Sequence, residues 1–281
     1  MRQKYTTFQR GAVQGVCIPE IEPHLSFFAG GFEGWLAGQP MRRFLERPNF
    51  VAGLRLPPTI RISGPASDRT AGFPVVLKRF GWRSPLHRMV RSLTGSKAIR
   101  SFRTAMILRE HGVVTPRPLI AWDFKDGGTA SASYYITEEI PDAITLREIL
   151  KSSINLESEK PALLAELARL VRGMHDAGIF HRDLTIGNFL VAPEPVACLP
   201  DRREGNRIFL IDLSRAVHLG RVPIPLRWMD MARMKLQDLW PVFFAAYCAD
   251  RPDWKTWRPL LDFMIRMRRW KMVLRKKIKG R

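Results

Sequence analysis

A short segment in the second half of the chain carries two side chains whose types and spacing suit phosphoryl transfer. It reads His181-Arg-Asp-Leu-Thr-Ile-Gly-Asn188, so Asp183 and Asn188 lie about one loop turn apart. Transfer of a phosphoryl group to a hydroxyl needs a carboxylate that orients the hydroxyl and accepts its proton. It also needs an oxygen ligand for the metal ion on the phosphates. The segment therefore predicts that Asp183 is the catalytic base and Asn188 a metal ligand.

Two further segments strengthen this prediction. The apolar run Phe209-Leu-Ile ends in Asp212, and the run Val75-Val-Leu ends in Lys78. In protein kinases an H-R-D-x-x-x-x-N loop lies between a strand lysine, which neutralises the nucleotide phosphates, and an aspartate that binds magnesium. The order of Lys78, Asp183 and Asp212 is the same, so we expect a kinase-like chain with ATP and Mg²⁺ as cofactors. Lys78 is the predicted phosphate clamp and Asp212 the second metal ligand.

Length and composition favour a folded protein of the cytosol. The chain has 281 residues, of which 46% are hydrophobic, enough for one large domain or two small ones sharing a cleft. Its apolar runs are much shorter than the ~20 residues of a membrane span, and the N-terminus lacks a signal-peptide pattern. The 3 cysteines lack C-x-x-C spacing, so we expect neither a disulfide framework nor a zinc site.

The net charge of +20 is concentrated in two stretches, residues 78–109 and 251–281. Such clustering predicts a polyanionic partner, although a solvated basic face that keeps the protein soluble is an alternative. Residues 257–279 mix Arg and Lys with Trp and aliphatic side chains. This pattern fits a helix in an anionic membrane interface, or a core helix with a basic outer face. Few aromatic side chains are interleaved for base stacking, so no nucleic acid partner is expected.

The N-terminal half shows mainly strand patterns. Residues 1–40 are predicted to be an extension that packs on the first lobe, because the glycines at 29–35 lack the G-x-G-x-x-G spacing of a nucleotide loop. From 42 to 80 the pattern is strand-like, with alternation at Thr59–Ile62 and a second run at Phe73–Phe80. No glycine-rich flap is apparent there.

A helix and a hairpin follow. Residues 96–111 predict a helix with Ser96 as its N-cap, but it carries no acidic residue before Glu110 in its last turn, whereas kinases place a lysine-binding Glu here. The strands at 119–124 and 133–140 predict a hairpin that leads to the hinge. Backbone groups near Glu138 and Ile140 would bind adenine there, although an exposed strand end is the alternative for Glu138.

The C-terminal half begins with two predicted helices. Thr145-x-x-Glu148 is a capping box that opens a short helix, and residues 161–175 carry an apolar stripe that ends in the catalytic segment. His181 is expected to hold this segment in place and not to transfer protons. Thr185 occupies a position where Ser/Thr protein kinases commonly carry Lys.

The segment after Asp212 bears on the acceptor. It contains no A-P-E sequence, and only residues 214–227 precede the next helical run, expected at 228–239. A peptide-docking segment is therefore expected to be absent or much reduced. Both this and Thr185 favour a small-molecule or glycan acceptor.

Over residues 75–239 the chain resembles the lipopolysaccharide kinase family, the bacterial Kdo and heptose kinases. The likeness rests on Val75-Val-Leu-Lys-Arg-Phe80, Arg100-Ser-Phe-Arg-Thr-Ala105, Gly112-Val-Val-Thr-Pro-Arg-Pro-Leu119, Tyr135-Ile-Thr-Glu-Glu139, residues 181–190 and Ile211-Asp-Leu-Ser214. A departure is the absence of a Glu, often present in these kinases, from the helix that holds Ser101.

The resemblance implies an α+β, two-lobed protein-kinase-like fold. The N-lobe would be a small antiparallel sheet with one helix at 41–140, preceded by the 1–40 extension, and the mainly helical C-lobe would span 141–281 with a basic C-terminal helix. It also implies ATP-dependent phosphorylation of a Kdo or heptose hydroxyl on a lipopolysaccharide core or lipid A precursor, at the cytoplasmic face of the inner membrane.

Two alternatives remain open from the sequence. One is an atypical Ser/Thr protein kinase. The other is a catalytically weak pseudokinase scaffold at the membrane, suggested by the missing helix Glu and glycine-rich flap.

Overall fold

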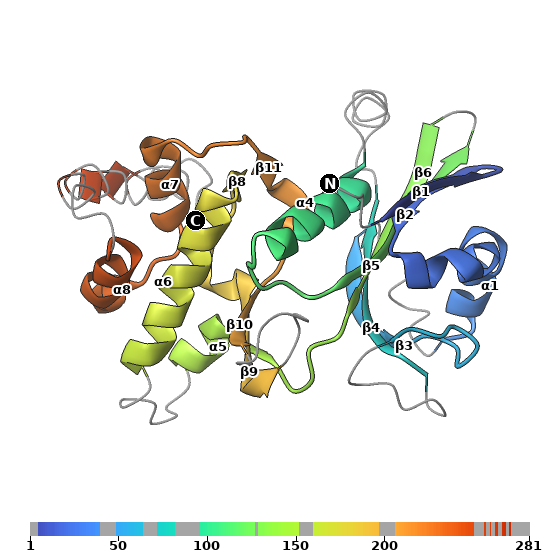
Figure 1. Cartoon of the computed structure of the whole chain (residues 1–281), viewed down its shortest axis with the longest axis horizontal. Helices are drawn as coiled ribbons and strands as arrows, with labels where there is room; N and C mark the ends of the chain where they lie inside the picture. Colours follow the sequence, from blue (N-terminus) through green and yellow to red (C-terminus); the bar gives the residue numbers. More distant parts are fainter. Residues whose placement is uncertain are drawn as a thin grey trace, which may run out of the picture. The chain divides into compact units, whose positions relative to one another are not determined.

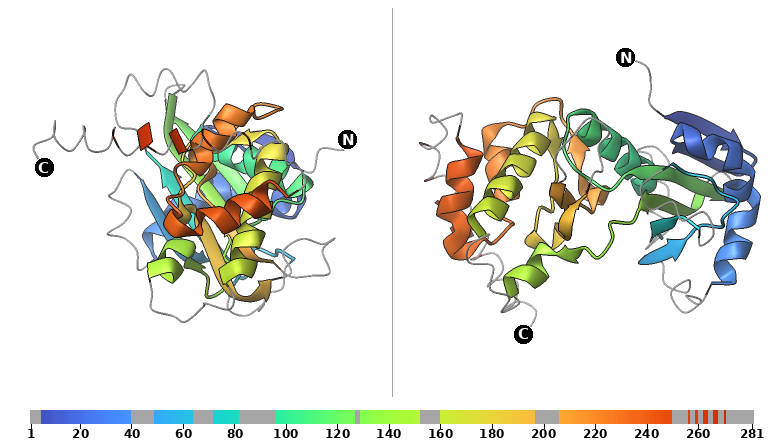
Figure 2. Two further views of the ribbon diagram at one scale, coloured as in Figure 1. Left: turned by 90° about the vertical axis from the view of Figure 1, so that its left-hand side faces the viewer. Right: turned by 60° about the horizontal axis from the view of Figure 1, so that its bottom comes forward.

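The computed structural model describes residues 5–39, 49–63, 72–81, 96–126, 129–151, 160–196 and 206–249, with residues 256, 259, 262–263, 266–267 and 270 near the C-terminus (Figures 1 and 2). The chain forms two compact units. Unit 1 comprises Met1–Met106 and Pro116–Ile140, and unit 2 comprises Ile107–Thr115 and Pro141–Arg281. Within the described ranges no helix combines the length and apolar character that a membrane span requires.

Unit 1 is built on a six-stranded antiparallel sheet with strand order β1-β2-β5-β6-β4-β3. The strands are β1 (Thr6–Arg10), β2 (Val13–Cys17), β3 (Phe50–Arg55), β4 (Pro74–Phe80), β5 (Pro118–Asp126) and β6 (Thr129–Glu138). The predicted strand at 73–80 and the predicted hairpin at 119–140 are confirmed by β4 and by the pair β5–β6.

The first forty residues contribute two strands to this sheet. β2 pairs with β5, and this pairing places Gly15 opposite Trp122. A Cβ atom at Gly15 would collide with the carbonyl oxygen of Ala121 and with the Trp122 side chain, so only glycine fits at this crossing. The close approach of the two backbones ties the N-terminal segment to the middle of the sheet.

Helices cover both faces of the sheet (Figure 1). They are η1 (Pro19–His24), the π-helical turn η2 (Phe27–Gly31), α1 (Phe32–Ala37) and α4 (Lys97–Glu110). Ser96 Oγ accepts a hydrogen bond from the Ile99 N–H at 3.1 Å, which confirms the predicted N-cap of α4. The sequence predicted one helix in this lobe, which is α4. The structure adds α1, which covers the face of the sheet opposite to α4 (Figure 1).

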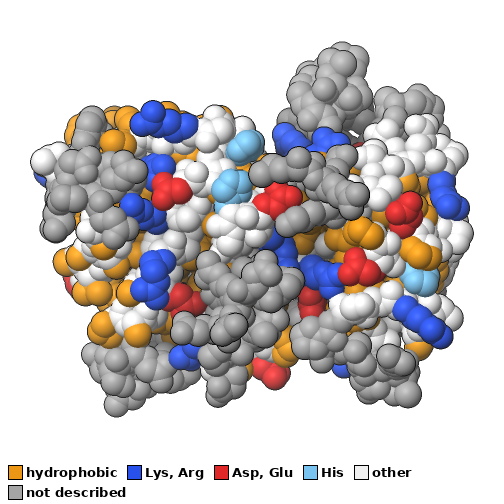
Figure 3. Space-filling model, in the orientation of Figure 1, with side chains coloured by type: hydrophobic (Ala, Val, Ile, Leu, Met, Phe, Trp, Pro, Cys, Tyr) orange, Lys and Arg blue, Asp and Glu red, His pale blue; other side chains and the backbone are white. Residues whose placement is uncertain are grey.

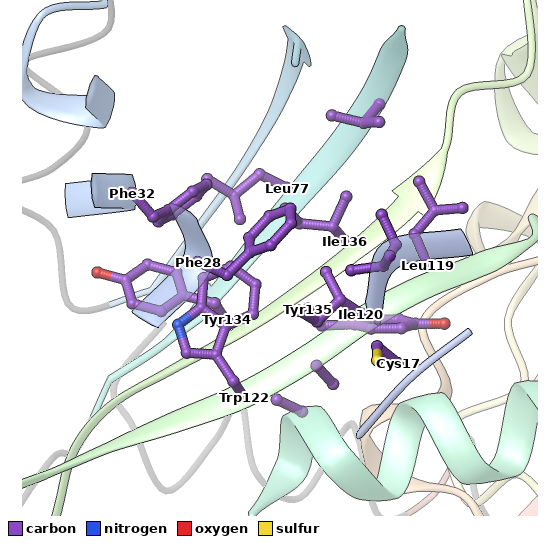
Figure 4. Close-up of a cluster of buried hydrophobic side chains, with 14 of the residues drawn as sticks. Cys17, Phe28, Phe32, Leu77, Leu119, Ile120, Trp122, Tyr134, Tyr135 and Ile136 are labelled. Atoms are coloured by element: carbon purple, nitrogen blue, oxygen red, sulfur yellow. The ribbon is translucent and has the colours of Figure 1, made fainter. Parts of the chain in front are cut away.

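An aromatic cluster joins α1 and η2 to the sheet (Figure 4). Phe28 and Phe32 pack edge-on against Trp122, with the Phe32 and Trp122 ring centroids 4.8 Å apart, and Tyr134 stacks on Trp122 at 5.1 Å. All four side chains are almost fully buried. Because Trp122 and Tyr134 are directly paired across β5 and β6, the cluster also fixes the register of the hairpin.

One predicted strand is wrong. Thr59–Ile62 alternates as expected, and Ile60 and Ile62 are buried, but no strand forms there. Pro57 begins a turn that is closed by a hydrogen bond from the Ile60 N–H to the Pro57 carbonyl at 2.9 Å. Two buried isoleucines therefore account for the alternation without a strand.

Unit 2 is mainly helical and carries short sheets. Its helices are α5 (Leu146–Lys151), α6 (Lys160–Asp176), α7 (Ile224–Met231) and α8 (Trp240–Tyr247), with 3₁₀ turns η3 (Ile186–Asn188), η4 (Leu213–Arg215) and η5 (Gln237–Leu239). Its strands are β7 (Ile144–Thr145), β8 (Ile179–Phe180), β9 (Phe189–Val196), β10 (Asn206–Leu210) and β11 (Val217–His218). The strand orders are β10-β9-β7 and β11-β8.

Two local predictions in unit 2 are confirmed and a third is partly wrong. α6 matches the helix expected at 161–175. The capping box opens α5, because the Glu148 carboxylate accepts from the Thr145 N–H at 2.8 Å and Thr145 Oγ1 accepts from the Glu148 N–H at 3.2 Å. The helical run expected at 228–239 instead begins at Ile224 and ends at Met231, followed by the separate turn η5.

Much of the predicted basic surface lies outside the described residues. Residues 82–95 and most of 251–281 belong to this part, as does Cys198, whereas Cys17 and Cys248 are buried and free. On the face shown in Figure 3, the described Lys and Arg side chains are dispersed among acidic and apolar ones.

Candidate active site

The predicted catalytic loop connects β8 to η3 in unit 2, and a buried carboxylate on α7 anchors its start. Asp230 is fully buried, and its two oxygens accept hydrogen bonds from the N–H groups of His181 at 2.7 Å and Arg182 at 2.8 Å. Arg182 has a φ of 68°, in the left-handed region that non-glycine residues seldom adopt. Asp230 therefore stabilises a strained backbone immediately before Asp183.

His181 connects the loop to the segment that carries Asp212. Its ring is buried, and Nε2 lies 3.3 Å from the carbonyl oxygen of Ile211. Burial lowers the pKa of the His181 imidazole below its ordinary value near 6.5, so the ring is neutral at physiological pH. These contacts agree with the structural role expected for this residue.

The structure places Asp183, Asn188 and Asp212 on backbone segments that are hydrogen-bonded to one another. The Asn188 side-chain amide donates to the Asp183 carbonyl oxygen at 2.7 Å, which closes the loop on itself. The Ile211 N–H donates to the Asn188 carbonyl at 2.9 Å, so Asp212 directly follows a residue bonded to Asn188. Pairing of Leu210 with Phe189 in β10 and β9 extends the same register.

Asp212 lies at a bend in the backbone. Its φ and ψ are both 57°, in the left-handed region, and its Oδ1 accepts from Ser214 Oγ at 2.8 Å. The left-handed turn ends the extended run from β10 and begins η4. A local side-chain bond thus orients the carboxylate at the point where the chain changes direction.

The oxygens of Asn188 and Asp212 fit a magnesium ion. Mg²⁺ prefers hard oxygen ligands, and in nucleotide sites it is held by one or two carboxylates together with phosphates. The Asn188 amide nitrogen is engaged with Asp183, so the amide oxygen is the atom it can offer a cation. Among the described residues no group of three or more His, Cys, Asp or Glu side chains is placed to hold a metal ion.

Asp183 is partly exposed and forms an ion pair. Its Oδ2 lies 3.1 Å from Nη1 of Arg215, with side-chain exposures of 33% and 65%. An exposed pair of this kind contributes only about 0–1 kcal/mol to stability. The carboxylate is thus oriented by Arg215 and still accessible to an incoming hydroxyl.

The remaining predicted site residues belong to unit 1. Lys78 lies on β4, and its Nζ is 5.4 Å from the centre of the Phe80 ring. The Glu138 N–H donates a hydrogen bond to the Arg117 carbonyl at 2.9 Å and is therefore engaged within unit 1. Ile140 is the last residue of unit 1 and its side chain is buried. Glu110, the acidic residue expected in a poor position, lies in the final turn of α4, in the part that belongs to unit 2.

Sequence reasoning missed the residues that support the loop. Asp230 is the single acidic residue of α7, whose other residues are apolar apart from Arg227, and an isolated carboxylate in an apolar helix is a signal that could have identified it. Arg215, three residues after Asp212, gave no comparable signal. Its role depends on a contact across 32 residues of chain.

A buried polar network extends from Asp230 toward α8. His175 Nε2 lies 3.5 Å from Asp230, and His175 Nδ1 lies 2.7 Å from the Tyr247 hydroxyl. Arg227 donates to Asp176 at 2.7 Å and to the Val222 carbonyl at 2.9 Å. Burial lowers the pKa of His175 and raises that of Tyr247, so both are neutral and interact as dipoles.

Comparison with known proteins identifies the family of the chain. A sequence profile described as "Lipopolysaccharide kinase (Kdo/WaaP) family" matches residues 82–244, more than half of the chain. The chain belongs to this family. The resemblance found in the sequence is therefore confirmed.

Relatives in the lipopolysaccharide kinase family share about a third of the aligned residues. A 3-deoxy-D-manno-octulosonic acid kinase of Vibrio vulnificus (strain YJ016) is 31% identical over 153 residues, covering 51% of this chain and 62% of the relative. The lipopolysaccharide core heptose(I) kinase WaaP of Escherichia coli (strain K12) is 33% identical over 132 residues, which cover 45% of this chain and 44% of the relative. The chain thus spans less than two thirds of the length of either relative.

A solved structure shows the fold. The structure described as WaaP in complex with acyl carrier protein is similar with a TM-score of 0.53 over 85% of this chain and 95% of that chain, at 22% sequence identity. The predicted protein-kinase-like α+β fold is confirmed.

Proposed function

We propose that the protein transfers the γ-phosphoryl group of Mg-ATP to a sugar hydroxyl, Kdo or heptose, of a lipopolysaccharide core or lipid A precursor. The observation that carries this proposal is that the segments bearing Asp183, Asn188 and Asp212 are hydrogen-bonded to one another within unit 2 of a lipopolysaccharide kinase family member. The names of its relatives, a Kdo kinase and a heptose kinase, support the choice of acceptor.

Each residue has a proposed part in the reaction. Asp183 orients the acceptor hydroxyl and accepts its proton, while Lys78 neutralises the nucleotide phosphates and the backbone at Glu138 and Ile140 binds adenine. Asn188 and Asp212 would hold Mg²⁺. When bound, the metal neutralises negative charge on the phosphates. Positioning and charge neutralisation thus provide most of the catalysis.

The short segment after Asp212 supports a glycan acceptor. Only Leu213–Pro223 separates Asp212 from the start of α7, and this stretch contains the 3₁₀ turn η4 and the two-residue strand β11. So few residues offer little extended backbone on which a peptide substrate could bind as an added strand. A sugar hydroxyl needs no such surface.

The test is phosphorylation of glycolipid by the purified protein with labelled ATP and total lipopolysaccharide precursors, read by mass spectrometry. We expect a mass gain of one phosphate on the glycolipid. Asp183→Asn should lower turnover by about 10²–10⁴-fold, the usual contribution of a general base, while ATP affinity stays within about threefold. The matched control is Asp238→Asn, which changes an exposed aspartate on η5 and should leave turnover unchanged.

Three outcomes would contradict the proposal. Label on protein and not on glycolipid would favour an atypical protein kinase. ATP binding without transfer to any acceptor would favour a pseudokinase scaffold. Retention of more than a tenth of the wild-type turnover in Asp183→Asn would remove Asp183 from the role of base.

We also propose peripheral attachment to the cytoplasmic face of the inner membrane through the C-terminal segment. Phe263, Met267 and Trp270 are helical and 57%, 46% and 59% exposed, and their spacing of four and three residues places them on one helix face. We call these three side chains the C-terminal apolar face. It lies in a stretch, 251–281, with a net charge of +10, and each cation near an anionic surface contributes about 1 kcal/mol.

Vesicle co-sedimentation tests the attachment. The protein should bind vesicles rich in phosphatidylglycerol at least tenfold more strongly than pure phosphatidylcholine vesicles. Replacement of the C-terminal apolar face by three serines should remove most of this binding, whereas Val51→Ser, at a 59% exposed site in unit 1, should not. Equal binding to both vesicle types would refute the proposed attachment.

A further inference from the structure

Two exposed arginines from different elements of unit 2 contact the predicted catalytic loop. Arg215, in η4, contacts Asp183, and Arg147, in α5, contacts the loop at Thr185 and Gly187. Neither contact is needed to build the metal-binding pair Asn188 and Asp212. The two guanidinium groups are therefore available to bind an anion during the reaction.

The position of Arg147 is built into the loop. Its Nη2 lies 3.4 Å from Thr185 Oγ1, and a Cβ atom on Gly187 would lie 2.6 Å from Nη2 and 2.7 Å from Cζ. The guanidinium thus occupies space that any other residue at 187 would fill. Within the described part of the chain, this long bond to a neutral hydroxyl engages one of the five N–H donors of Arg147. The nearby Glu148 carboxylate bonds to the Thr145 N–H and hydroxyl at 2.8 and 2.7 Å, which fixes the start of α5.

Arg215 already contacts a carboxylate of the chain. Its Nη1 already lies 3.1 Å from a carboxylate oxygen, that of Asp183, and its side chain is 65% exposed. An exposed ion pair is weak, so it exchanges readily for a better one. A guanidinium and a carboxylate can form two parallel hydrogen bonds, which makes a carboxylate on the ligand a strong competitor.

We propose that Arg147 and Arg215 form a subsite for the carboxylate of an anionic acceptor, and that the acceptor is consequently a sugar acid. The inference rests on the proposed function and names the substrate class of the same site. The acceptor hydroxyl binds Asp183, and Arg215 leaves that carboxylate for the carboxylate of the sugar. Arg147, from α5, adds a second positive charge beside the loop. Without these cations, Asp183, Asp212 and the nucleotide phosphates would repel a negatively charged acceptor.

The experiment compares a charged and a neutral form of one ligand. The probes are the methyl glycoside of 3-deoxy-D-manno-octulosonic acid and its carboxyl methyl ester. Binding to the full chain, in the presence of Mg²⁺ and a non-hydrolysable ATP analogue, is measured by titration calorimetry, and initial rates are measured with ATP. The wild-type protein should bind the acid at least tenfold more tightly than the ester.

Variants then assign the preference to the two arginines. Arg215→Gln and Arg147→Gln should each reduce the acid-over-ester ratio at least threefold, and the double variant should abolish it. Gly187→Ala should act like Arg147→Gln, because the new methyl group displaces the guanidinium without removing its charge. The control Arg221→Gln removes an exposed arginine of the same unit and should leave the ratio unchanged.

A further variant separates ligand binding from mere orientation of Asp183. Asp183→Asn releases Arg215 from its ion pair, so it should bind the acid at least twofold more tightly although turnover is lost. If Arg215 only orients Asp183, Arg215→Gln will lower kcat equally for acid and ester, and their binding ratio will not change. That result would overturn the proposal, as would equal binding of acid and ester by the wild-type protein.

The binding readout also keeps this inference distinct from the proposed function. Loss of phosphorylation with a preserved acid preference would refute the kinase assignment and support the subsite. Efficient phosphorylation of a neutral sugar, with no preference for the acid, would refute the subsite and support the kinase assignment.

Discussion

Replacement of Asp230 by asparagine should separate the support of the catalytic loop from its chemistry. The carboxylate accepts two backbone hydrogen bonds, from His181 at 2.7 Å and Arg182 at 2.8 Å, in a fully buried site. Asparagine has nearly the same shape but only one acceptor oxygen. One of the two N–H groups would therefore face an amide NH₂ and lose its partner.

The expected loss of stability in Asp230→Asn follows from the two hydrogen bonds that Asp230 accepts from the His181 and Arg182 N–H groups. Hydrogen bonds to a charged group contribute about 1.5–3 kcal/mol each, and a buried donor left without a partner costs about 1–3 kcal/mol. Removal of a buried charge offsets part of this loss. We therefore expect Asp230→Asn to reduce the free energy of unfolding of unit 2 by about 2–4 kcal/mol, a large share of the roughly 5–15 kcal/mol of a typical protein.

Hydrogen exchange and turnover measure the two consequences. Exchange of the His181 and Arg182 amides should accelerate by roughly 30-fold or more, since 1.4 kcal/mol corresponds to a factor of ten. Turnover should fall about 100-fold, because Asp183 follows Arg182 directly and small displacements of a catalytic group are costly. Asp238→Asn is again the control. Unchanged exchange at both amides, or full turnover despite faster exchange, would refute the argument.

Two further predictions concern stability. Burial places the folded-state pKa of His175 and His181 below the ordinary value of 6.5, so the unfolded chain binds more protons below that pH. The free energy of unfolding should therefore decrease as the pH falls below 6.5, by up to about 1.4 kcal/mol per pH unit for each histidine. Urea unfolding at pH 7.5, 6.5 and 5.5 measures the free energy of unfolding. The control His111→Gln changes an exposed histidine and should keep the same pH dependence. A free energy of unfolding that does not change with pH would contradict the prediction. Gly15→Ala should destabilise unit 1 by about 2–3 kcal/mol because the methyl group meets neighbouring backbone, whereas Gly34→Ala, in open space on α1, should stabilise by up to about 1 kcal/mol. Similar urea midpoints for the two alanine variants would show that the crossing at Gly15 tolerates a side chain.

Several elements could be predicted because their information is local. The α5 capping box joins Thr145 and Glu148, three residues apart, and the apolar stripe of α6 repeats with the helical period. The strand predicted at Thr59–Ile62 was wrong because a local pattern can arise without the structure that it usually indicates. Burial of Ile60 and Ile62 produced a strand pattern, but the turn at Pro57 determined the backbone.

The sequence by itself determined the chemistry that the loop offers. Asp183 with Asn188, and Asp212 two residues after β10, could be predicted from residue type and spacing because their positions on one loop and beyond one strand end follow from the local chain path. Only the tertiary structure decided which distant groups hold and surround them. Asp230 and Arg215 reach the loop through contacts across 48 and 32 residues of chain, and β2 joins β5 across more than a hundred. Such contacts form only when helices and strands that are far apart in the sequence pack together. Local sequence patterns therefore do not predict them.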